Sequence, residues 1–315
     1  MVWSFSSSRS FQKCQRQWYI KNFIANAKAK DQIRHEAYLL SKFQSLYAWR
    51  GTIVDQVISN SIIPAINSKH QLSPNQIIQI AKKLYDEQLE FARLNRIREP
   101  GMTISKAGES FAALYPIEYD GQVADDELLQ AWQDIENALE CFLHMDELNE
   151  TLNSARYLLP QRALSFTYDS ISARTVPDLI VFFSNKPPMI VDWKVHTYAI
   201  QNYRLQLACY AIGLTTCKPH RDFPVLTNRY LPNEIKLLEV QLLTRQLRHY
   251  ELTESDVEAV LSYIVMSARE MDLATTPFDG QVLTLVDFST TANPEECQRC
   301  SFRSLCWENS NYVKT

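Results

Sequence analysis

The pattern of apolar and polar positions divides the chain into a helical first half and a strand-rich second half. The first 60 residues read mostly as helix, with an interruption at Gly51. Ser73 followed by Pro74 is typical of an N-cap and a first helical residue, and predicts a helix over 74–94. A second clear helix is expected from about Asp125, because apolar residues recur there at helical spacing and acids occupy the other face.

After residue 160, short apolar or alternating runs replace the helical pattern. Strands are predicted at 163–170, 171–183, 189–196, 235–244 and 247–253. Helices are expected at 202–214 and 255–271, with Ser255 as the cap of the second. The order of these elements predicts an α/β fold: a helical N-terminal half, a mixed sheet with a crossing helix, and a C-terminal tail.

Composition indicates a globular protein with a real core. The chain has 315 residues, of which 46% are hydrophobic and 22% charged. No apolar run approaches the ~20 residues that span a bilayer, and the N-terminus lacks the apolar region of a signal peptide. We therefore expect no membrane partner and a cytoplasmic location. The seven cysteines are then expected to be metal ligands or buried thiols rather than disulfides.

Charge is distributed unevenly along the chain, although the net charge is only −4. Residues 1–50 hold nine Lys or Arg and two acids, whereas residues 118–150 hold eleven acids and no Lys or Arg. The basic stretch, with Trp18 and Tyr19 nearby, has the composition of a surface that follows a phosphate backbone. A solvated charged face is the alternative, and charge alone does not decide between the two.

Two apolar runs within 177–196, PDLIVFFSNKPPMIVDWKVH, carry charges where buried strands are expected. Asp178 begins the first run, and Asp192 and Lys194 share one face of the second because side chains alternate along a strand. A buried charge is costly unless it is paired or binds a metal. From these residues, a Mg²⁺ site with an activated water and a buried Asp–Lys ion pair are both open interpretations.

The same residues resemble the core motifs of the PD-(D/E)XK nucleases. Pro177-Asp178 and Asp192-Trp193-Lys194 match the two halves of that motif. Gln206 and Tyr210 match the QxxxY motif of the RecB-like branch, and their i, i+4 spacing places both on one helix face. The segment from Gly51 to Asp55 falls where that branch has G-x-x-V-His, with Asp in place of His. A carboxylate there suits Mg²⁺ or Mn²⁺ better than an imidazole, and an exposed helix Asp is the alternative.

Both ends of the chain carry a further resemblance. Near the C-terminus the cysteines follow a C-x2-C-x5-C spacing, and a fourth lies in SFSSSRSFQKCQRQWY at the N-terminus: Cys297, Cys300, Cys306 and Cys14. This resembles the split site of the CRISPR-associated and AddB-type RecB-like nucleases, in which a [4Fe–4S] cluster fastens the two ends together. Four thiolates can equally hold zinc, and the resemblance favours iron–sulfur. The other three, Cys141, Cys209 and Cys217, are expected to be ordinary buried thiols.

The resemblance implies a restriction-endonuclease-like mixed sheet flanked by helices, with a helical insertion and an iron–sulfur staple. On this basis the chain divides into an N-terminal helical part of the nuclease domain, the helical insertion, the nuclease core and the C-terminal cysteine segment, at 1–60, 61–160, 161–285 and 286–315.

The resemblance implies that the protein is a metal-dependent deoxyribonuclease that acts on single strands or DNA ends. It favours an exonuclease over an endonuclease. The Mg²⁺ or Mn²⁺ ligands would be Asp55, Asp178, Asp192 and the backbone carbonyl of Trp193. Lys194 would position the attacking water, and Gln206 and Tyr210 would help to place Lys194 and the DNA strand. The implied role is phage defence, spacer processing or recombination repair, beside a separate helicase or ATPase, because the chain has no G-x-x-x-x-G-K-[ST] loop.

Two other classes remain open at this stage. A nucleic-acid-binding or scaffolding subunit with a vestigial site would account for the missing histidine and for the acidic helix. A zinc-stapled structural protein would account for the cysteines, but it leaves the Asp-x-Lys strand and the QxxxY helix unexplained.

Overall fold

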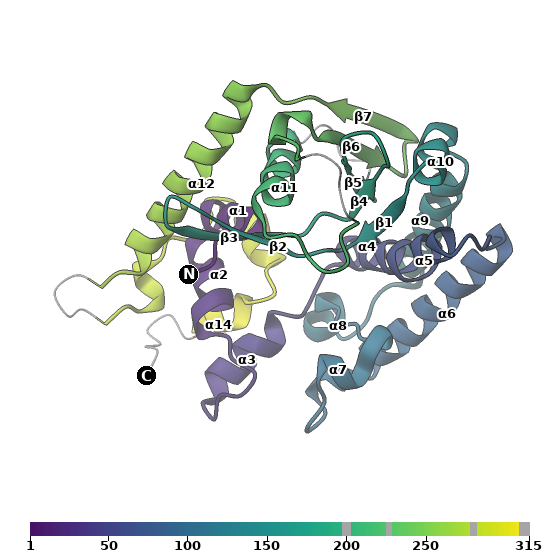
Figure 1. Ribbon diagram of the computed structural model, residues 1–315. Helices are drawn as coiled ribbons and strands as arrows, with labels where there is room; N and C mark the ends of the chain where they lie inside the picture. The colour runs from purple at the N-terminus through teal and green to yellow at the C-terminus, as the bar shows by residue number, and fades with distance from the viewer. Residues whose placement is uncertain (197–202, 225–228, 278–281, 309–315) are drawn as a thin grey trace.

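Figure 1 shows the fold in a computed structural model that describes residues 1–196, 203–224, 229–277 and 282–308. A five-stranded mixed sheet occupies the middle of the molecule, and helices cover both of its faces. Its strands are β1 (Tyr157–Pro160), β4 (Leu179–Phe182), β5 (Met189–Lys194), β6 (Lys236–Gln241) and β7 (Gln246–Tyr250). The spatial order is β1-β4-β5-β6-β7, which confirms the predicted α/β class with a central mixed sheet.

The connections explain why the sheet is mixed. The short turn between β4 and β5 makes that pair antiparallel, whereas β5 and β6 are parallel. A parallel pair needs a crossover connection, and the helix α11 (Arg204–Thr216) lies on the chain between them. The outer pairs, β1 with β4 and β6 with β7, are antiparallel.

Alternation along the strands separates two hydrophobic cores. Ile180, Ile190 and Leu237 belong to the core on one face, and Leu179 and Val191 belong to the core on the other. Because β4 and β5 are buried on both faces, they read as continuous apolar runs in the sequence.

One face of the sheet is covered by helices from both ends of the chain, and the other by helices from the first half. The first face carries α1 (Phe5–Lys13), α2 (Gln15–Tyr19), α11 and α12 (Glu254–Thr275). The second carries α4 (Leu46–Val57), α6 (Pro74–Arg93), α9 (Asp125–Leu143) and α10 (Asp146–Asn153). The remaining α-helices are α3 (Gln32–Leu40), α5 (Ile63–Asn67), α7 (Ile104–Ala107), α8 (Tyr115–Asp120), α13 (Pro294–Gln298) and α14 (Arg303–Glu308).

Single turns of other helix types join several of these elements. Two π-helical turns continue α2 and α4, at η1 (Ile20–Ile24) and η2 (Ile58–Ile62). The 3₁₀ turns are η3 (Arg96–Arg98), η4 (Gly108–Ser110), η5 (Pro232–Glu234) and η6 (Leu285–Asp287).

A separate hairpin of β2 (Leu164–Tyr168) and β3 (Ile171–Thr175) packs against α11. Gly213 of α11 makes this close approach possible, since a Cβ there would lie 2.5 Å from the Oγ1 atom of Thr175. Trp3 extends the hairpin by a parallel bridge to Ala173. The hairpin therefore packs closely along α11, which itself contacts β5 and β6 of the sheet.

The two ends of the chain lie side by side. Trp3 donates a hydrogen bond from Nε1 to Ser267 Oγ of α12 at 2.9 Å. Arg16 donates from Nε to the carbonyl oxygen of Phe288 at 3.3 Å, and the rings of Tyr19 and Phe288 stack at 3.9 Å. In Figure 1, α14 lies beside α2, and Arg16 Nη1 donates to Cys306 Sγ of α14 at 3.8 Å.

Several boundaries differ from the sequence predictions. The helix α4 runs through Gly51 without interruption, because its packing against α6 and α9 outweighs the modest cost of one helical glycine. The segment predicted as one strand over 171–183 is two strands of different sheets. The cap of α12 is Thr253, whose side chain accepts the Asp256 N–H, and not Ser255. A strand, β1, lies within the predicted helical insertion.

No helix in the described ranges is both long and apolar enough to cross a membrane.

Candidate active site

The site lies at the start of β4 and at the end of β5. The last residues of β5 extend beyond Leu179, the first residue of β4. Leu179 pairs with Val191, so Asp178, one residue before β4, lies opposite Asp192. Asp178 accepts a hydrogen bond at Oδ2 from the backbone N–H of Trp193 at 3.0 Å. Asp192 is only 1% exposed. The two runs that carry charge in the sequence thus bring two carboxyl groups together in the interior.

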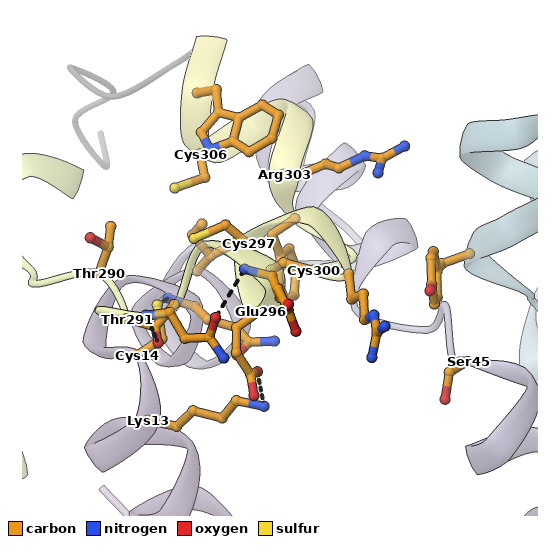
Figure 2. Close-up of a pocket in the computed structure, with 18 of the residues that line it drawn as sticks. Lys13, Cys14, Ser45, Thr290, Thr291, Glu296, Cys297, Cys300, Arg303 and Cys306 are labelled. Carbon is orange, nitrogen blue, oxygen red and sulfur yellow. Dashed lines mark hydrogen bonds and ion pairs between the residues drawn. The ribbon is translucent and has the colours of Figure 1, made fainter.

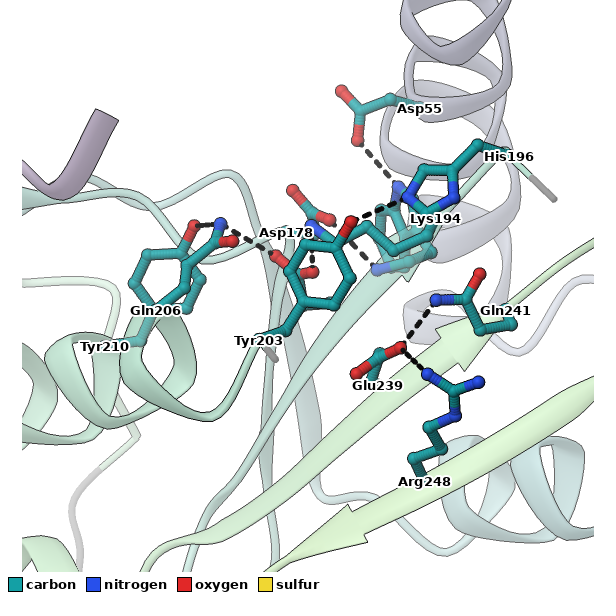
Figure 3. Close-up of polar contacts among 12 residues, drawn as sticks. Asp55, Asp178, Lys194, His196, Tyr203, Gln206, Tyr210, Glu239, Gln241 and Arg248 are labelled. Atoms are coloured by element: carbon teal, nitrogen blue, oxygen red, sulfur yellow. Dashed lines mark hydrogen bonds and ion pairs between the residues drawn. The ribbon is translucent and has the colours of Figure 1, made fainter. Parts of the chain in front are cut away.

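Lys194 lies on the same face of β5 as Asp192, and the two form an ion pair. The ammonium group also lies 4.5 Å from the ring centroid of Tyr203, and Tyr203 in turn shares a 2.8 Å hydrogen bond with His196 Nε2. Figure 3 shows the hydrogen bond between Tyr203 and His196, with Lys194 beside them. A cation held between a carboxylate and an aromatic face is restricted in position as well as charge-compensated.

Asp55 reaches this site from α4, which covers the face of the sheet opposite to α11. Its Oδ1 accepts from Trp193 Nε1 at 3.1 Å and from Gln161 Nε2 at 2.7 Å. Gln161 Nε2 also donates to Asp178 Oδ1 at 3.2 Å. Asp55 is therefore not an isolated surface acid: Gln161 donates both to it and to Asp178, and Figure 3 shows Asp55 at the edge of the same group of polar side chains.

The QxxxY pair points at the same place from α11. Gln206 donates from Nε2 to Asp192 Oδ1 at 3.4 Å, and it also donates to the hydroxyl group of Tyr210. The i, i+4 spacing makes both contacts possible from one helix face. All five predicted catalytic residues thus meet in the fold, together with Asp55 and Trp193, while their chemical roles stay predictions.

The electrostatics of the site favour a bound cation. Burial raises the pKa of Asp178 well above its ordinary value, and the charges of Asp192 and Asp55 raise it further. Burial also raises the pKa values of Asp192 and Asp55, despite the hydrogen bonds that each accepts. Burial alone would lower the pKa of Lys194, but Asp192 and Asp178 outweigh it, so that the pKa is raised. Three carboxyl groups therefore face one ammonium group.

The donor set suits a hard divalent cation, because carboxylate and carbonyl oxygens are the ligands that Mg²⁺ and Mn²⁺ prefer. Across the described part of the chain, however, no three His, Cys, Asp or Glu side chains already stand in the arrangement of a metal site. A bound cation would neutralise the mutual repulsion of the carboxyl groups and so favour their closer approach.

The sequence analysis missed several polar residues of the site. Glu239 is fully buried on β6 and pairs in register with Asp192. It accepts from Gln241 Nε2 at 2.5 Å, from Arg248 Nη1 at 3.2 Å and from Tyr250 at 2.5 Å. Polar residues that alternate with apolar ones in KLLEVQ were the available signal for Glu239 and Gln241. Nothing local marks Gln161 or Tyr203, because their contacts depend on the tertiary fold.

The four predicted cluster cysteines line one pocket of about 580 Å³, shown in Figure 2. They come from the start of α2 and from the segment around α13 and α14, and all four are free thiols: Cys14, Cys297, Cys300 and Cys306. Burial raises the pKa of the Cys300 thiol to about 11, and the other three thiols also raise it. The remaining cysteines, Cys141, Cys209 and Cys217, are buried elsewhere, as expected.

Comparisons with known proteins give a family and two structural relatives. A profile of the PD-(D/E)XK nuclease superfamily matches residues 2–307. A candidate exonuclease from Eubacterium rectale is 11% identical with a TM-score of 0.46, over 100% of this chain and 90% of its own. The protein SSO0001 is 12% identical with a TM-score of 0.31, over 72% of this chain and 96% of its own. No curated protein sequence matches.

The profile extends over nearly the whole chain, and the residues that match the family motifs meet at one buried site. The protein therefore belongs to the PD-(D/E)XK nuclease superfamily.

Proposed function

We propose that the protein is a metal-dependent deoxyribonuclease that hydrolyses phosphodiester bonds of single-stranded DNA or of DNA ends. The observation that carries this proposal is the convergence of three carboxyl groups and one ammonium group from α4, β4 and β5. Such a group of charges is costly to bury without a ligand to compensate it, and it is the combination that hydrolysis of a phosphodiester needs.

The cation, Mg²⁺ or Mn²⁺, would be held by Asp55, Asp178, Asp192 and the backbone carbonyl of Trp193. When bound, it would act as a Lewis acid toward the scissile phosphate. The protein's own contribution begins with orientation: Asp55 and Asp178 are each held by a donor of Trp193, one from the ring and one from the backbone. A ligand whose direction is fixed before binding loses less entropy on binding.

Lys194 is the residue that would orient the attacking water. Its ammonium group is held by Asp192 and by the ring of Tyr203, so its N–H bonds have limited freedom. Its raised pKa keeps it protonated at neutral pH, so it would act as a hydrogen-bond donor that positions the water and the phosphate, and not as the base.

Gln206 and Tyr210 would position the DNA strand relative to Asp192. Gln206 is bonded on one side to Asp192 and on the other to Tyr210, so a shift of α11 would move this contact directly. The basic N-terminal stretch adds phosphate-binding charge to the same chain. We propose DNA as the partner, in phage defence, spacer processing or repair, beside a separate helicase or ATPase.

We also propose that Cys14, Cys297, Cys300 and Cys306 hold a [4Fe–4S] cluster, with zinc as the alternative. Support comes from the donor set: four free thiols from the two ends of the chain line one pocket. Such a site would act as a staple between the ends and would not take part in hydrolysis.

The nuclease proposal is tested by cleavage of labelled DNA with Mn²⁺ or Mg²⁺, with and without EDTA. Linear and circular forms of single strands and duplexes separate end-dependent from internal cutting, and a labelled RNA tests the choice of sugar. Asp192→Ala should abolish cleavage while the fold stays intact, because the change removes a metal ligand and little packing. Glu258→Ala, an exposed acid of α12, is the matched control and should cut at the wild-type rate.

Cleavage by Asp192→Ala protein at the wild-type rate would show that the metal-site interpretation is wrong. Absence of metal-dependent cleavage by the wild type on every substrate, with DNA binding retained, would instead favour a binding subunit with a vestigial site.

A further inference from the structure

Gln161 has an unusual backbone conformation at the mouth of the site. It directly follows β1, and its φ of 48° lies in the left-handed region, which non-glycine residues seldom adopt. Its backbone N–H donates to the carbonyl oxygen of Asp178 at 3.0 Å, so the strand pairing of β1 with β4 continues one residue further. A conformation of this kind persists only where the surroundings fix it, and such residues cluster at functional sites.

The side chain of Gln161 connects two carboxyl groups that belong to different elements. One nitrogen atom, Nε2, donates to Asp55 Oδ1 at 2.7 Å and to Asp178 Oδ1 at 3.2 Å. A primary amide has two N–H bonds, so it can satisfy both acceptors at once. Gln161 is itself exposed, whereas Asp55 and Asp178 are only partly exposed, so its amide lies on the solvent side of the two carboxyl groups.

The amide nitrogen occupies the place between two oxygens where a shared cation would make its contacts. An amide carries no net charge, so it bridges the carboxyl groups without neutralising them. A cation bound to both Oδ1 atoms needs the same acceptor lone pairs. The two hydrogen bonds of Gln161 are therefore present in the metal-free protein and must break when a cation takes those lone pairs.

We propose that Gln161 is a positioning residue whose amide is a placeholder for the cation: it bridges Asp55 and Asp178 in the metal-free protein, yields when the metal binds, and so lowers metal affinity. The inference rests on the proposed function of the site. Both carboxyl groups keep other donors: Trp193 bonds each of them, and Ser59 also donates to Asp55 Oδ1 at 3.4 Å. Removing the amide therefore removes a competitor for their lone pairs without releasing the carboxyl groups.

The alternative is that Gln161 turns its amide and serves as a metal ligand through Oε1. The two roles predict opposite changes in affinity when the amide is removed. A placeholder stabilises only the metal-free state, so its loss tightens binding. A ligand stabilises only the bound state, so its loss weakens binding.

The experiment is calorimetric titration of the EDTA-treated full-length protein with Mn²⁺, for the wild type and Gln161→Leu. Leucine keeps the size of the side chain and removes the amide. We expect Mn²⁺ to bind Gln161→Leu roughly tenfold more tightly, which corresponds to about 1.4 kcal/mol and is the size of one net hydrogen bond. Thermal unfolding of the metal-free variant should occur at a lower temperature than that of the wild type.

Two glycine variants separate the amide from the backbone. Gln161→Gly also removes the amide but relieves the left-handed conformation, so it should show the same tighter binding and a smaller loss of metal-free stability. Lys69→Gly relieves a similar conformation, with φ of 55°, after α5 and should leave Mn²⁺ affinity unchanged.

Equal or weaker Mn²⁺ binding by Gln161→Leu, with normal binding by the wild type, would overturn the placeholder and leave the nuclease proposal standing. Tighter binding by Gln161→Gly alone would also overturn it, because the cause would then be the backbone. A wild-type protein that binds no Mn²⁺ would overturn both proposals.

Discussion

At the scale of single residues, the carboxyl group of Asp178 has a pKa well above its ordinary value. Its pKa is raised by burial and by the neighbouring charges of Asp192 and Asp55. The folded state therefore holds the proton more tightly than the unfolded chain does. Between the ordinary carboxyl pKa and this raised value, the folded state binds more protons, so stability falls as the pH rises.

This linkage predicts how Asp178→Asn behaves in the absence of metal. Asparagine is neutral at every pH. As the pH rises from about 4 to about 8, the variant should therefore lose less stability than the wild type. At about pH 8 in EDTA, Asp178→Asn should unfold at a higher temperature than the wild type. Mn²⁺ should stabilise only the wild type. Thermal unfolding followed by circular dichroism measures both effects. A difference in unfolding temperature that stays constant with pH would contradict the prediction.

Asp55 provides a second prediction, because it stands where the RecB-like branch has histidine. As a metal ligand, it should be as sensitive as Asp192: Asp55→Ala should lower the cleavage rate by roughly a hundredfold or more. Asp55→His restores a side chain that can bind metal and should keep part of the activity. Rates on a labelled single strand with Mn²⁺ check this. Normal turnover by Asp55→Ala would make Asp55 a structural partner of Trp193 instead.

The sequence was most informative where neighbours along one strand or helix form the site. Asp192 and Lys194 share a face of one strand, and Gln206 and Tyr210 share a face of one helix, so local periodicity predicts each pair. Gln161 was not predictable in this way. Its role depends on a turn after β1 and on the pairing of β1 with β4, which no local pattern specifies.

At the scale of elements, α11 is held by one close contact with the hairpin. A Cβ added at Gly213 would lie 2.5 Å from Thr175 Oγ1 and 3.5 Å from atoms of Leu164 and Phe166. Thr175 is buried and β-branched, so one rotation about χ1 places its methyl group at this contact, and the other is restricted by the stiffness of χ1 in a β-branched residue. The helix would have to move, and it carries Gln206 with it.

We therefore predict that Gly213→Ala destabilises the protein by about 1–3 kcal/mol, the usual cost of overpacking. Gly51→Ala is the matched control, because Gly51 also lies inside a helix but has open space around it; alanine there should add about 1 kcal/mol of stability. Urea unfolding measures both. Thr175→Ala should restore much of the stability lost in Gly213→Ala, and a double variant no better than the single one would contradict the packing explanation.

Element boundaries were predictable to different degrees. The start of α6 was predicted from Ser73 and Pro74, because the preferences for an N-cap and for a first helical proline are local. The structure adds a capping box between Ser73 and Gln76. The division of 171–183 was not predicted, because Pro177 and Asp178 separate two strands that differ only in which partner each one finds. Gly51 illustrates the opposite error: the cost of a helical glycine is modest, and packing of α4 against α6 and α9 outweighs it.

At the scale of the whole molecule, the cysteine pocket leads to a prediction about metal content and stability. Anaerobically purified protein should be brown and hold roughly four irons per chain. Serine at Cys14, Cys297, Cys300 or Cys306 should remove the colour. It should also lower the free energy of unfolding by roughly 2–4 kcal/mol, the cost of losing a disulfide that closes a long loop. Alanine at the buried Cys209 is the control and should keep the colour.

Iron and zinc analysis of the same preparations decides between the two metals. Colourless anaerobic protein with one zinc per chain would replace the cluster by a zinc staple. The nuclease proposal would be unaffected, since the carboxyl groups of the active site do not depend on the metal that joins the ends.

The contact between the ends has a consequence for the order of events during protein synthesis. Trp3 and Arg16 are translated 264 and 272 residues before their partners Ser267 and Phe288. The buried ring of Tyr19, which stacks on Phe288, therefore lacks this partner until the segment around Phe288 has been made. A nascent chain that stalls before this segment would keep such aromatic side chains exposed, and exposed apolar surface of this kind is what chaperones bind.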